Sequence, residues 1–254
     1  MRNIWILLKK EWYSYFASPI IYTVLSIFLF LSGYFFYSNV AYFSLMSLQA
    51  SQWPGAEFNL ATWVIEPLMS DMSIILLILL PLLTMRLFAE EKRQGNLELL
   101  CSYPVRNIEL VLGKFLGCVS IYALMLFFTL LYPFLLWWVG RTDLGPFFSG
   151  YLGLLLLGSA FIAFGIFISS LTENQIVAAA LTFGLLLFFW IINWTAYITE
   201  PPLSKVFENI SLISHFRHFT QGVIDTADII FYLTLIIFGL FLALRSLETQ
   251  RLRG

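Results

Sequence analysis

The pair Gly113-Lys114 is the point at which this sequence comes closest to a nucleotide-binding motif. A phosphate-binding loop follows the pattern G-x-x-x-x-G-K-[ST], because its backbone amides hold the phosphates and its hydroxyl binds the metal ion. Here Ile108 stands where the first glycine is needed, and Phe115 stands where serine or threonine is needed. We therefore expect the chain to bind no nucleotide cofactor and to hydrolyse no ATP by this route.

Two histidines one helical turn apart, His215 and His218, have a spacing compatible with a bound metal ion. No third ligand stands at a defined spacing from them, so we predict a solvated pair beside Arg217 and no metal site. The cysteines Cys101 and Cys118 form no metal-ligand pattern either, and we expect free thiols.

The apolar stretches contain no arrangement of side chains that is typical of a catalytic site. They contain neither a serine–histidine arrangement nor paired carboxylates, which an intramembrane enzyme would need. The four longest stretches without charge also lack the Asp, Glu or His that a proton-driven carrier would place there. We predict no catalytic residue and no enzyme activity of the chain itself.

The composition indicates that lipid surrounds much of the chain. Of its 254 residues, 60% are hydrophobic and 11% are charged, and the mean hydropathy is +0.85. A soluble domain carries about a quarter of charged residues, which form its solvated shell. The formal net charge of -1 argues against nucleic acid as a partner, because nucleic acid is bound by clustered Lys and Arg.

Stretches without charge predict an all-α, polytopic membrane protein with six spans, since about 20 apolar residues cross the hydrocarbon core. A transmembrane domain over residues 20–246 would precede a tail at 247–254. In the fourth span, Gly153, Gly158 and Gly165 predict close helix packing rather than a pathway lining. The predicted spans cover 20–40, 68–88, 115–139, 147–169, 176–197 and 227–245.

Lysine and arginine are distributed unequally between the two sets of connectors. With the N-terminus inside, eleven of the 14 fall on the cytoplasmic side, whereas Arg141, Lys205 and Arg217 fall outside. Because short cytoplasmic connectors are rich in these residues, we predict that both termini are cytoplasmic.

Residues 1–19 predict an amphipathic helix on the inner membrane surface, which Pro19 ends or bends into the first span. A membrane anchor and a helix that transmits motion are equally compatible with this pattern. We expect the apolar face to hold Ile4, Leu8, Trp12, Tyr15 and Phe16, and the polar side to hold Asn3, Lys9, Lys10 and Ser14. The candidate functional residues of this helix are Lys9, Lys10, Glu11 and Trp12.

The connector 86–114 is rich in charge and is the most informative segment. Leu97 and Leu100 could line one face of a short helix between Gly95 and Pro104. Composition alone favours the alternative, an ordinary solvated loop of the positive cytoplasmic side.

Three segments together resemble one family, the type-2 ABC exporter permeases. The N-terminal KKEWYSYFASPIIY is similar to the opening of these permeases, and SLISHFRHFTQGVIDTADIIFYL resembles their outer segment before the last span. Asn96 stands at a position of the signature loop where the family usually has Thr. The connector resembles the family's signature loop through Arg86, Phe88, Ala89, Glu90, Glu91, Gly95, Leu97, Glu98, Leu100, Pro104, Val105, Glu109, Gly113 and Lys114. Within the class, the chain is most similar to the permease subunit associated with bacterial gliding motility.

The resemblance implies a permease subunit of an ABC transporter whose energy comes from a separate ATP-binding subunit, which holds ATP and Mg²⁺. The connector would form a coupling helix that docks on that subunit, with the N-terminal helix beside it and short outer helices before the last span. The implied coupling residues are Arg86, Glu90, Glu91, Arg93, Gly95, Leu97, Glu98, Leu100 and Pro104.

The resemblance also implies a bacterial inner-membrane location and a dimer with a second permease subunit, either identical or related. Membrane lipid and an accessory periplasmic or membrane protein are further expected partners. An alternative is a membrane anchor whose ATPase partner drives a surface or gliding machine without moving a solute. The sequence identifies no substrate.

Overall fold

The computed structural model describes residues 2–50, 60–95, 106–140, 145–198 and 209–251. Within these ranges every secondary-structure element is a helix, so the all-α prediction is confirmed. Six helical stretches there are long and apolar enough to cross a membrane, which confirms the predicted polytopic class. They are Pro19–Leu48, Thr62–Arg93, Asn107–Trp138, Gly145–Leu171, Gln175–Ile192 and Thr226–Thr249.

Two of these stretches are built from more than one helix. The second combines a π-helical turn (Ala61–Ile65) with α3 (Glu66–Thr84) and α4 (Arg86–Arg93), and the third combines α6 (Asn107–Thr129) with α7 (Leu131–Gly140). The other spans are α2 (Pro19–Ala50), α8 (Gly145–Leu171), α9 (Gln175–Ile198) and α12 (Thr226–Arg251). Two shorter helices are α1 (Arg2–Ala17) and α11 (Leu212–Thr220).

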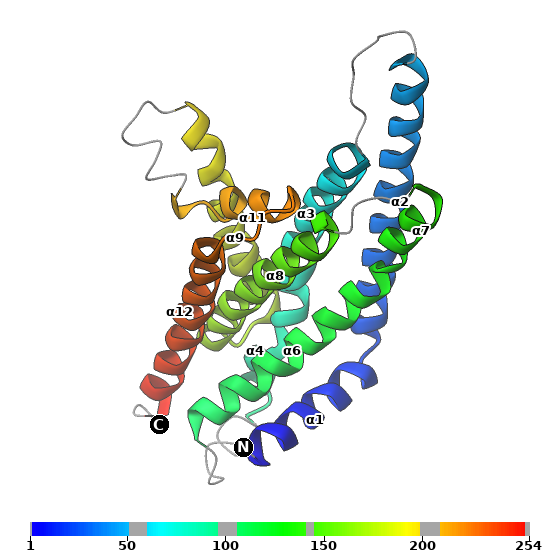
Figure 1. The fold of residues 1–254 in the computed structure, drawn as a ribbon. Coiled ribbons are helices and arrows are strands. Elements are labelled where there is room, and N and C mark those ends of the chain that lie inside the picture. Colours follow the sequence, from blue (N-terminus) through cyan, green and yellow to red (C-terminus); the bar gives the residue numbers. More distant parts are fainter. Residues whose placement is uncertain (1, 51–59, 96–105, 141–144, 199–208, 252–254) are drawn as a thin grey trace.

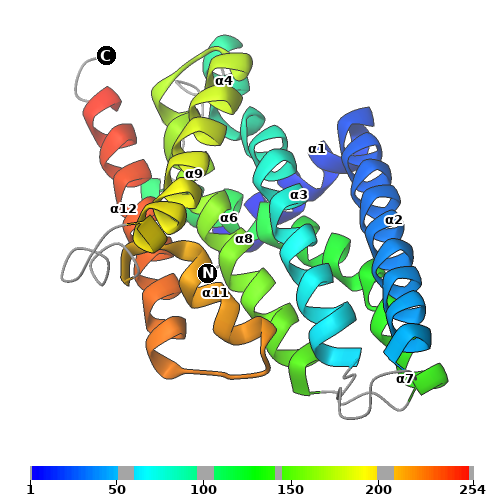
Figure 2. The same cartoon turned by 90° about the horizontal axis from the view of Figure 1, so that it is seen from above.

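The helix α8 lies at the centre of the bundle, where it contacts α3, α4, α6, α9, α11 and α12 (Figures 1 and 2). In its apolar stretch 78% of the residues are buried, compared with 17% in α9. Figure 1 shows α1 and α4 at one end of the bundle and α11 at the opposite end, so α8 reaches from one end to the other.

Small residues let the neighbouring helices approach α8 closely, as the sequence predicts. A Cβ atom added to Gly158 would lie 2.4 Å from the Tyr122 ring, and one added to Gly165 would lie 2.2 Å from Thr84 Oγ1. At Gly153 the same atom would lie 2.6 Å from Phe219 Cβ. These distances are shorter than van der Waals contact, so the three positions require glycine.

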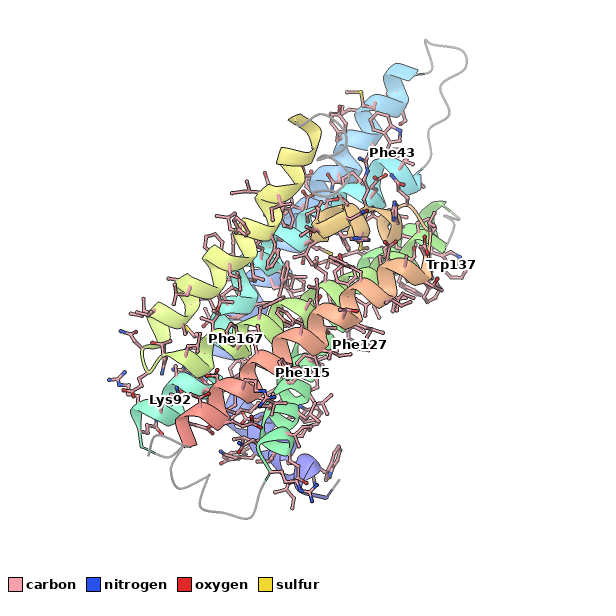
Figure 3. All side chains as sticks on the ribbon, turned by 90° about the vertical axis from the view of Figure 1, so that its left-hand side faces the viewer. Phe43, Lys92, Phe115, Phe127, Trp137 and Phe167 are labelled. Atoms are coloured by element: carbon pink, nitrogen blue, oxygen red, sulfur yellow. The ribbon has the colours of Figure 1, made fainter. Side chains whose placement is uncertain are left out.

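The outside of the bundle carries large apolar side chains that contact lipid in a membrane. Phe127 and Trp137, for example, are exposed and project outward from the third span (Figure 3). Such a surface is typical of helices solvated by hydrocarbon rather than by water.

The two histidines of α11 share one carboxylate partner, which corrects the prediction of a solvated pair, since His215 is largely covered and only His218 is exposed. Nδ1 of His215 lies 2.5 Å from Oδ1 of Asp228, and Nδ1 of His218 lies 2.9 Å from Oδ2 of the same carboxylate. Asp228 is buried in the first turn of α12. The helical spacing that was considered for a metal ion brings both rings to one carboxylate instead.

The apolar face predicted for α1 at the membrane surface is largely not the side by which α1 packs on the bundle. Trp12 and Phe16 are exposed, whereas Leu7 and Glu11 are buried against the bundle. The physical reason is that lipid can cover an apolar face, so the interior contact is free to use a carboxylate that finds a cationic partner.

Replacement of Gly165 by Ala tests the close approach of α8 to α3. The added methyl group would overlap Thr84, and overpacking of this kind costs about 1–3 kcal/mol. We expect Gly165→Ala to lower the thermal denaturation midpoint of the purified protein in mild detergent. Gly184→Ala is the matched control, because a Cβ atom at Gly184 meets no atom within 4 Å. Equal midpoints for the two variants would contradict the packing described.

Candidate functional site

Two glycines of α6 admit α1 at very short range. A Cβ atom on Gly113 would lie 2.7 Å from Leu7 Cβ, and one on Gly117 would lie 2.9 Å from Glu11 Cβ. Leu7 and Glu11 are four residues apart, as are the glycines, so one turn of α1 fits against one turn of α6. This contact carries the Glu11 side chain into the bundle.

Lys114 of α6 is a buried cation with two carboxylate partners. Its side chain is 2% exposed, and its Nζ lies 3.0 Å from Oε1 of Glu11 and 2.9 Å from Oε2 of Glu91. It also lies 5.1 Å from the centroid of the Phe88 ring. A buried charge is tolerated only when it is paired in this way, so α1, α4 and α6 are fixed relative to one another.

Lys10 extends this arrangement to the surface. Its Nζ lies 2.9 Å from Oε1 of Glu91, so the two oxygens of that carboxylate face different lysines. We call Glu11, Lys114, Glu91 and Lys10 the charge chain. Its formal charges cancel, and it joins three helices without leaving an unpaired buried ion.

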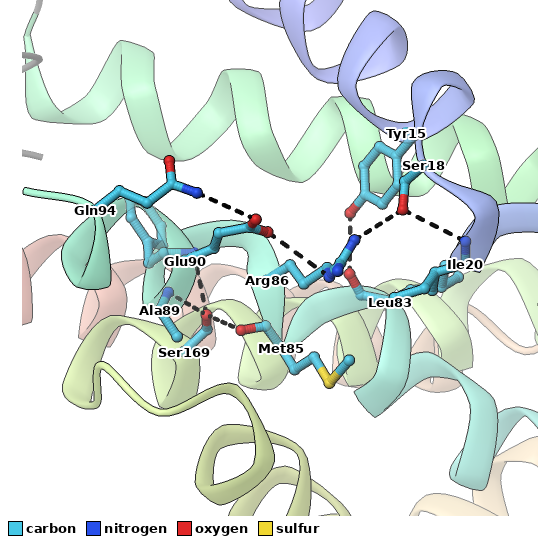
Figure 4. A network of polar contacts seen from close by, with 11 residues as sticks. Tyr15, Ser18, Ile20, Leu83, Met85, Arg86, Ala89, Glu90, Gln94 and Ser169 are labelled. Carbon is cyan, nitrogen blue, oxygen red and sulfur yellow. Dashed lines mark hydrogen bonds and ion pairs between the residues drawn. The ribbon is translucent and has the colours of Figure 1, made fainter. Parts of the chain in front are cut away.

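A second polar network lies beside the charge chain at the junction of α1 and α2 (Figure 4). Nη1 of Arg86 donates to Oγ of Ser18 at 2.8 Å, while its Nε lies 3.7 Å from Oε2 of Glu90. The Tyr15 hydroxyl donates to the Leu83 carbonyl oxygen at 3.1 Å. Burial raises the pKa of Tyr15 well above its ordinary value, so this phenol stays protonated and keeps its donor role.

Ser169 of α8 fastens the start of α4. Its Oγ accepts hydrogen bonds from the backbone N–H groups of Phe88 and Ala89, both at 3.1 Å, and donates to the Met85 carbonyl oxygen at 3.0 Å. Met85 separates α3 from α4, so these amides lie in the first turn of α4, where amides need an external partner. Figure 4 shows the Ser169 hydroxyl among them.

A cleft of about 690 Å³ opens between α1, α3 and α4. Residues of the charge chain and Arg86 line it together with Tyr13 and Ser14. Arg93 and Gly95 are exposed at the end of α4, where Gln94 also lines the cleft, and Gly95 has a φ of 69°, which favours glycine. The end of the bundle thus presents a polar cleft beside an exposed helix terminus.

The structure brings together some of the predicted site residues. Arg86, Glu90 and Glu91 line the cleft with Lys10 and Glu11, and Arg93 and Gly95 lie at its edge. Lys9 is exposed and lies over the Trp5 ring, and Trp12 donates from Nε1 to Ser120 Oγ. The predicted connector 86–114 is helical over 86–93 and 107–114. Leu97, Glu98, Leu100 and Pro104 lie outside the described residues.

Sequence reasoning missed the parts of the site that face inward. Glu91 was expected among the coupling residues of a helix that docks on the partner, but both of its oxygens are engaged within the chain. Ser169 and the interior position of Lys114 were not predicted. The spacing of Gly113 and Gly117 on α6 is the signal that could have shown close packing of a second helix beside Lys114.

No group of three or more His, Cys, Asp and Glu side chains with an arrangement that could hold a metal ion occurs among the described residues. The side chains around the cleft are paired cations and anions rather than a nucleophile with a base. Their arrangement is suited to binding a charged protein surface and to passing a force between helices, rather than to bond-breaking chemistry.

Replacement of Lys114 by Met tests whether the charge chain holds the three helices. Removal of the cation leaves the buried Glu11 carboxylate without its partner and close to that of Glu91, and breaking a buried pair in this way costs about 3–5 kcal/mol. We expect a large fall in the denaturation midpoint in mild detergent. Arg245→Met is the control, because Arg245 pairs with Glu248 at the surface, where an ion pair contributes about 0–1 kcal/mol. Similar midpoints for both variants would refute this role of Lys114.

Comparison with known proteins agrees with a transport role. A family model described as ABC-2 family transporter protein matches residues 5–246. A search of curated proteins finds no match. The matched region contains the charge chain, the cleft, five of the six apolar stretches described above and most of the sixth, so it covers far more than half of the chain. This chain therefore belongs to the ABC-2 transporter family, whose members are membrane subunits that lack an ATPase domain of their own and work with an ATP-binding ABC subunit.

Proposed function

We propose that this chain is the permease subunit of an ATP-driven exporter and that the ATP-binding subunit docks at the end of the bundle formed by α1 and α4. The observation that supports this most directly is the attachment of α4. One end of α4 is exposed at Arg93 and Gly95, while its first turn is bonded to the central helix through Ser169. A force applied to the exposed end reaches the bundle core through defined contacts.

Two connections leave the docking end. The charge chain links α4 to α1 and α6 through Glu91, Lys114 and Glu11. The other connection runs along α8, because Ser169 bonds α4 at one end of α8 and Ser149 Oγ donates to the Phe219 carbonyl oxygen of α11 at the other, at 2.8 Å. Movement of α4 during ATP binding and hydrolysis would therefore be transmitted through α8 to α11.

In this proposal ATP and Mg²⁺ are held entirely by the partner, which supplies the hydrolysis. The chain itself supplies the docking surface and the spans. Rim contacts from the exposed charges around the cleft would steer docking, because exposed charges act mainly on encounter and register.

We further propose a dimer with a second permease chain, an inner-membrane location and cytoplasmic placement of the α4 end. The sequence pattern assigns eleven of the 14 Lys and Arg residues to that side. Figure 1 shows that α1 begins and α12 ends at the same end of the bundle, in agreement with an even number of spans. The mostly exposed faces of α2, α9 and α12 are available for a second chain or for lipid.

The likeness to gliding-motility permeases stays a prediction from the sequence. We do not favour a mere membrane anchor, because an anchor has no need of bonded contacts that run from α4 through α8 to α11. The substrate of the exporter is left open by these contacts.

Charge reversal of Arg93 tests the docking surface without disturbing the fold. Arg93 is exposed at the end of α4, whereas Glu91 is held within the chain. We expect Arg93→Glu to reduce co-purification of a candidate ATP-binding subunit by about tenfold, which corresponds to about 1.4 kcal/mol. Arg93→Lys keeps the charge and should bind normally. Unchanged co-purification of the reversed variant would place the docking surface elsewhere.

Replacement of Ser169 by Ala tests transmission rather than docking. The variant loses the acceptor for the amides of Phe88 and Ala89, so we expect the complex to form while its ATPase rate no longer differs from that of the isolated ATP-binding subunit. Ser159→Ala is the matched control, since the Ser159 hydroxyl donates to Leu155 O of the same helix. Both variants keep the charge chain. A normal ATPase response in the Ser169 variant would remove this residue from the coupling path.

A further inference from the structure

The carboxylate of Asp228 holds α11 and α12 together at the end of the bundle opposite α4. Asp228 is 2% exposed, and its two oxygens face His215 and His218, which both belong to α11. Nothing in the proposed coupling path uses these three side chains. We refer to them as the histidine–aspartate cluster.

Both ring nitrogens of His215 face hydrogen-bond acceptors. Nδ1 lies 2.5 Å from Asp228 Oδ1, and Nε2 lies 3.1 Å from the backbone carbonyl oxygen of Asn209. A carbonyl oxygen can only accept, so Nε2 must carry a hydrogen, and a carboxylate oxygen likewise needs a proton between itself and Nδ1. The two contacts therefore require one proton more than a neutral imidazole and an ionised carboxylate possess together.

The contact of His218 with Asp228 requires no additional proton. Its Nδ1 lies 2.9 Å from Asp228 Oδ2, a contact that a neutral ring with a hydrogen on Nδ1 satisfies. Its side chain is 53% exposed. The cluster is thus satisfied by one His215 imidazolium, one Asp228 carboxylate and one neutral His218, with a net charge of zero.

The surroundings leave this ion pair as the main local charge. Phe231 stacks on the His215 ring with 4.0 Å between the ring centroids, and the Tyr232 hydroxyl donates to Leu212 O. On α11 itself, Arg217 points to Glu66 of α3 at 3.9 Å. Asp225 uses Oδ1 to accept from Ala227 N–H before α12, and Asp71 of α3 accepts from Asn39. The helices α8 and α9, which also pack on α11, contain no charged residue.

Loss of the extra proton breaks one of the two contacts of His215. A neutral ring can donate either to Asp228 or to Asn209 O, and its remaining lone pair then faces another acceptor. The buried carboxylate also loses its cationic partner, which is costly away from water. The other contacts of α11, such as that of Phe219 O with Ser149, are unaffected. Deprotonation therefore loosens α11 from α12 without detaching it from α8.

We propose that the histidine–aspartate cluster is a proton-binding site that latches α11 onto α12, and that the latch opens as the pH rises. The sign follows from proton counting: the latched form holds one more proton than the open form does when His215 is neutral, so the latch is stable at lower pH and weakens at higher pH. This inference goes beyond the proposed transport function and does not depend on the ATP-binding subunit.

Amide hydrogen exchange of the purified full chain in lipid nanodiscs tests the proposal. Protection of the α11 peptides, corrected for intrinsic exchange, is measured from about pH 6 to about pH 9. One proton released per opening raises the opening equilibrium constant by up to about tenfold per pH unit. We expect this slope in α11, and no such slope in the α8 peptides of the same sample.

Three variants separate the latch from general stability. His215→Gln and Asp228→Asn should both lose the slope and leave α11 weakly protected throughout, while α8 stays protected and so reports an intact fold. His218→Gln should lower protection but keep the slope, because it leaves the contacts of His215 in place. A flat wild-type response, or the same slope in His215→Gln, overturns the proposal. The wild-type result decides the question even if a variant fails to fold.

Discussion

Burial of the Lys114 ammonium between two carboxylates is the constraint on which the α4 end of the molecule depends. The partners come from different helices, Glu11 from α1 and Glu91 from α4. Because an unpaired charge at this depth would cost several kcal/mol, neither helix can leave while the bundle is intact. Gly113 and Gly117 make the pairing possible, since any side chain there would keep α1 and its carboxylate away. The position of the cleft follows from these contacts.

The central helix works by a different principle, because α8 contains no charged residue. Its neighbours are held by close approach at glycine positions and by serine hydroxyls that bond backbone groups, with Ser169 toward α4 and Ser149 toward α11. Where water is absent, a backbone amide or carbonyl without a partner is costly, so such contacts are retained as helices shift. A rigid α8 with a bonded contact at each end is therefore a suitable element to connect the two ends.

The sequence was sufficient to predict the helical class and the six spans. A segment that crosses the hydrocarbon core needs about 20 apolar residues, so each span can be recognised as an apolar stretch of that length. The inward-facing site was not predictable to the same degree. Among the adjacent charges Lys9, Lys10 and Glu11, only Glu11 turns inward, and this choice is made by glycines about 100 residues away on α6. Asp228 was likewise not linked to His215, because the angle at which the turn at Gly222 sets α12 against α11 does not follow from the spacing of the two residues in the sequence.

At each end of the bundle, a peripheral helix is held by one charged side chain that lies between two partners of the other kind, and the sign of the central charge is opposite at the two ends. At the α4 end a cation lies between two carboxylates, and at the α11 end a carboxylate lies between two histidines. A lysine ammonium ordinarily keeps its charge up to about pH 10, whereas the histidine–aspartate cluster in its latched form holds one proton more than a neutral imidazole and a carboxylate possess together. The first attachment is therefore permanent under physiological conditions and suits a surface that must receive a partner. The second attachment, that of α11, weakens when the pH rises. The contact between α11 and α12 is therefore the one that the surrounding pH can change.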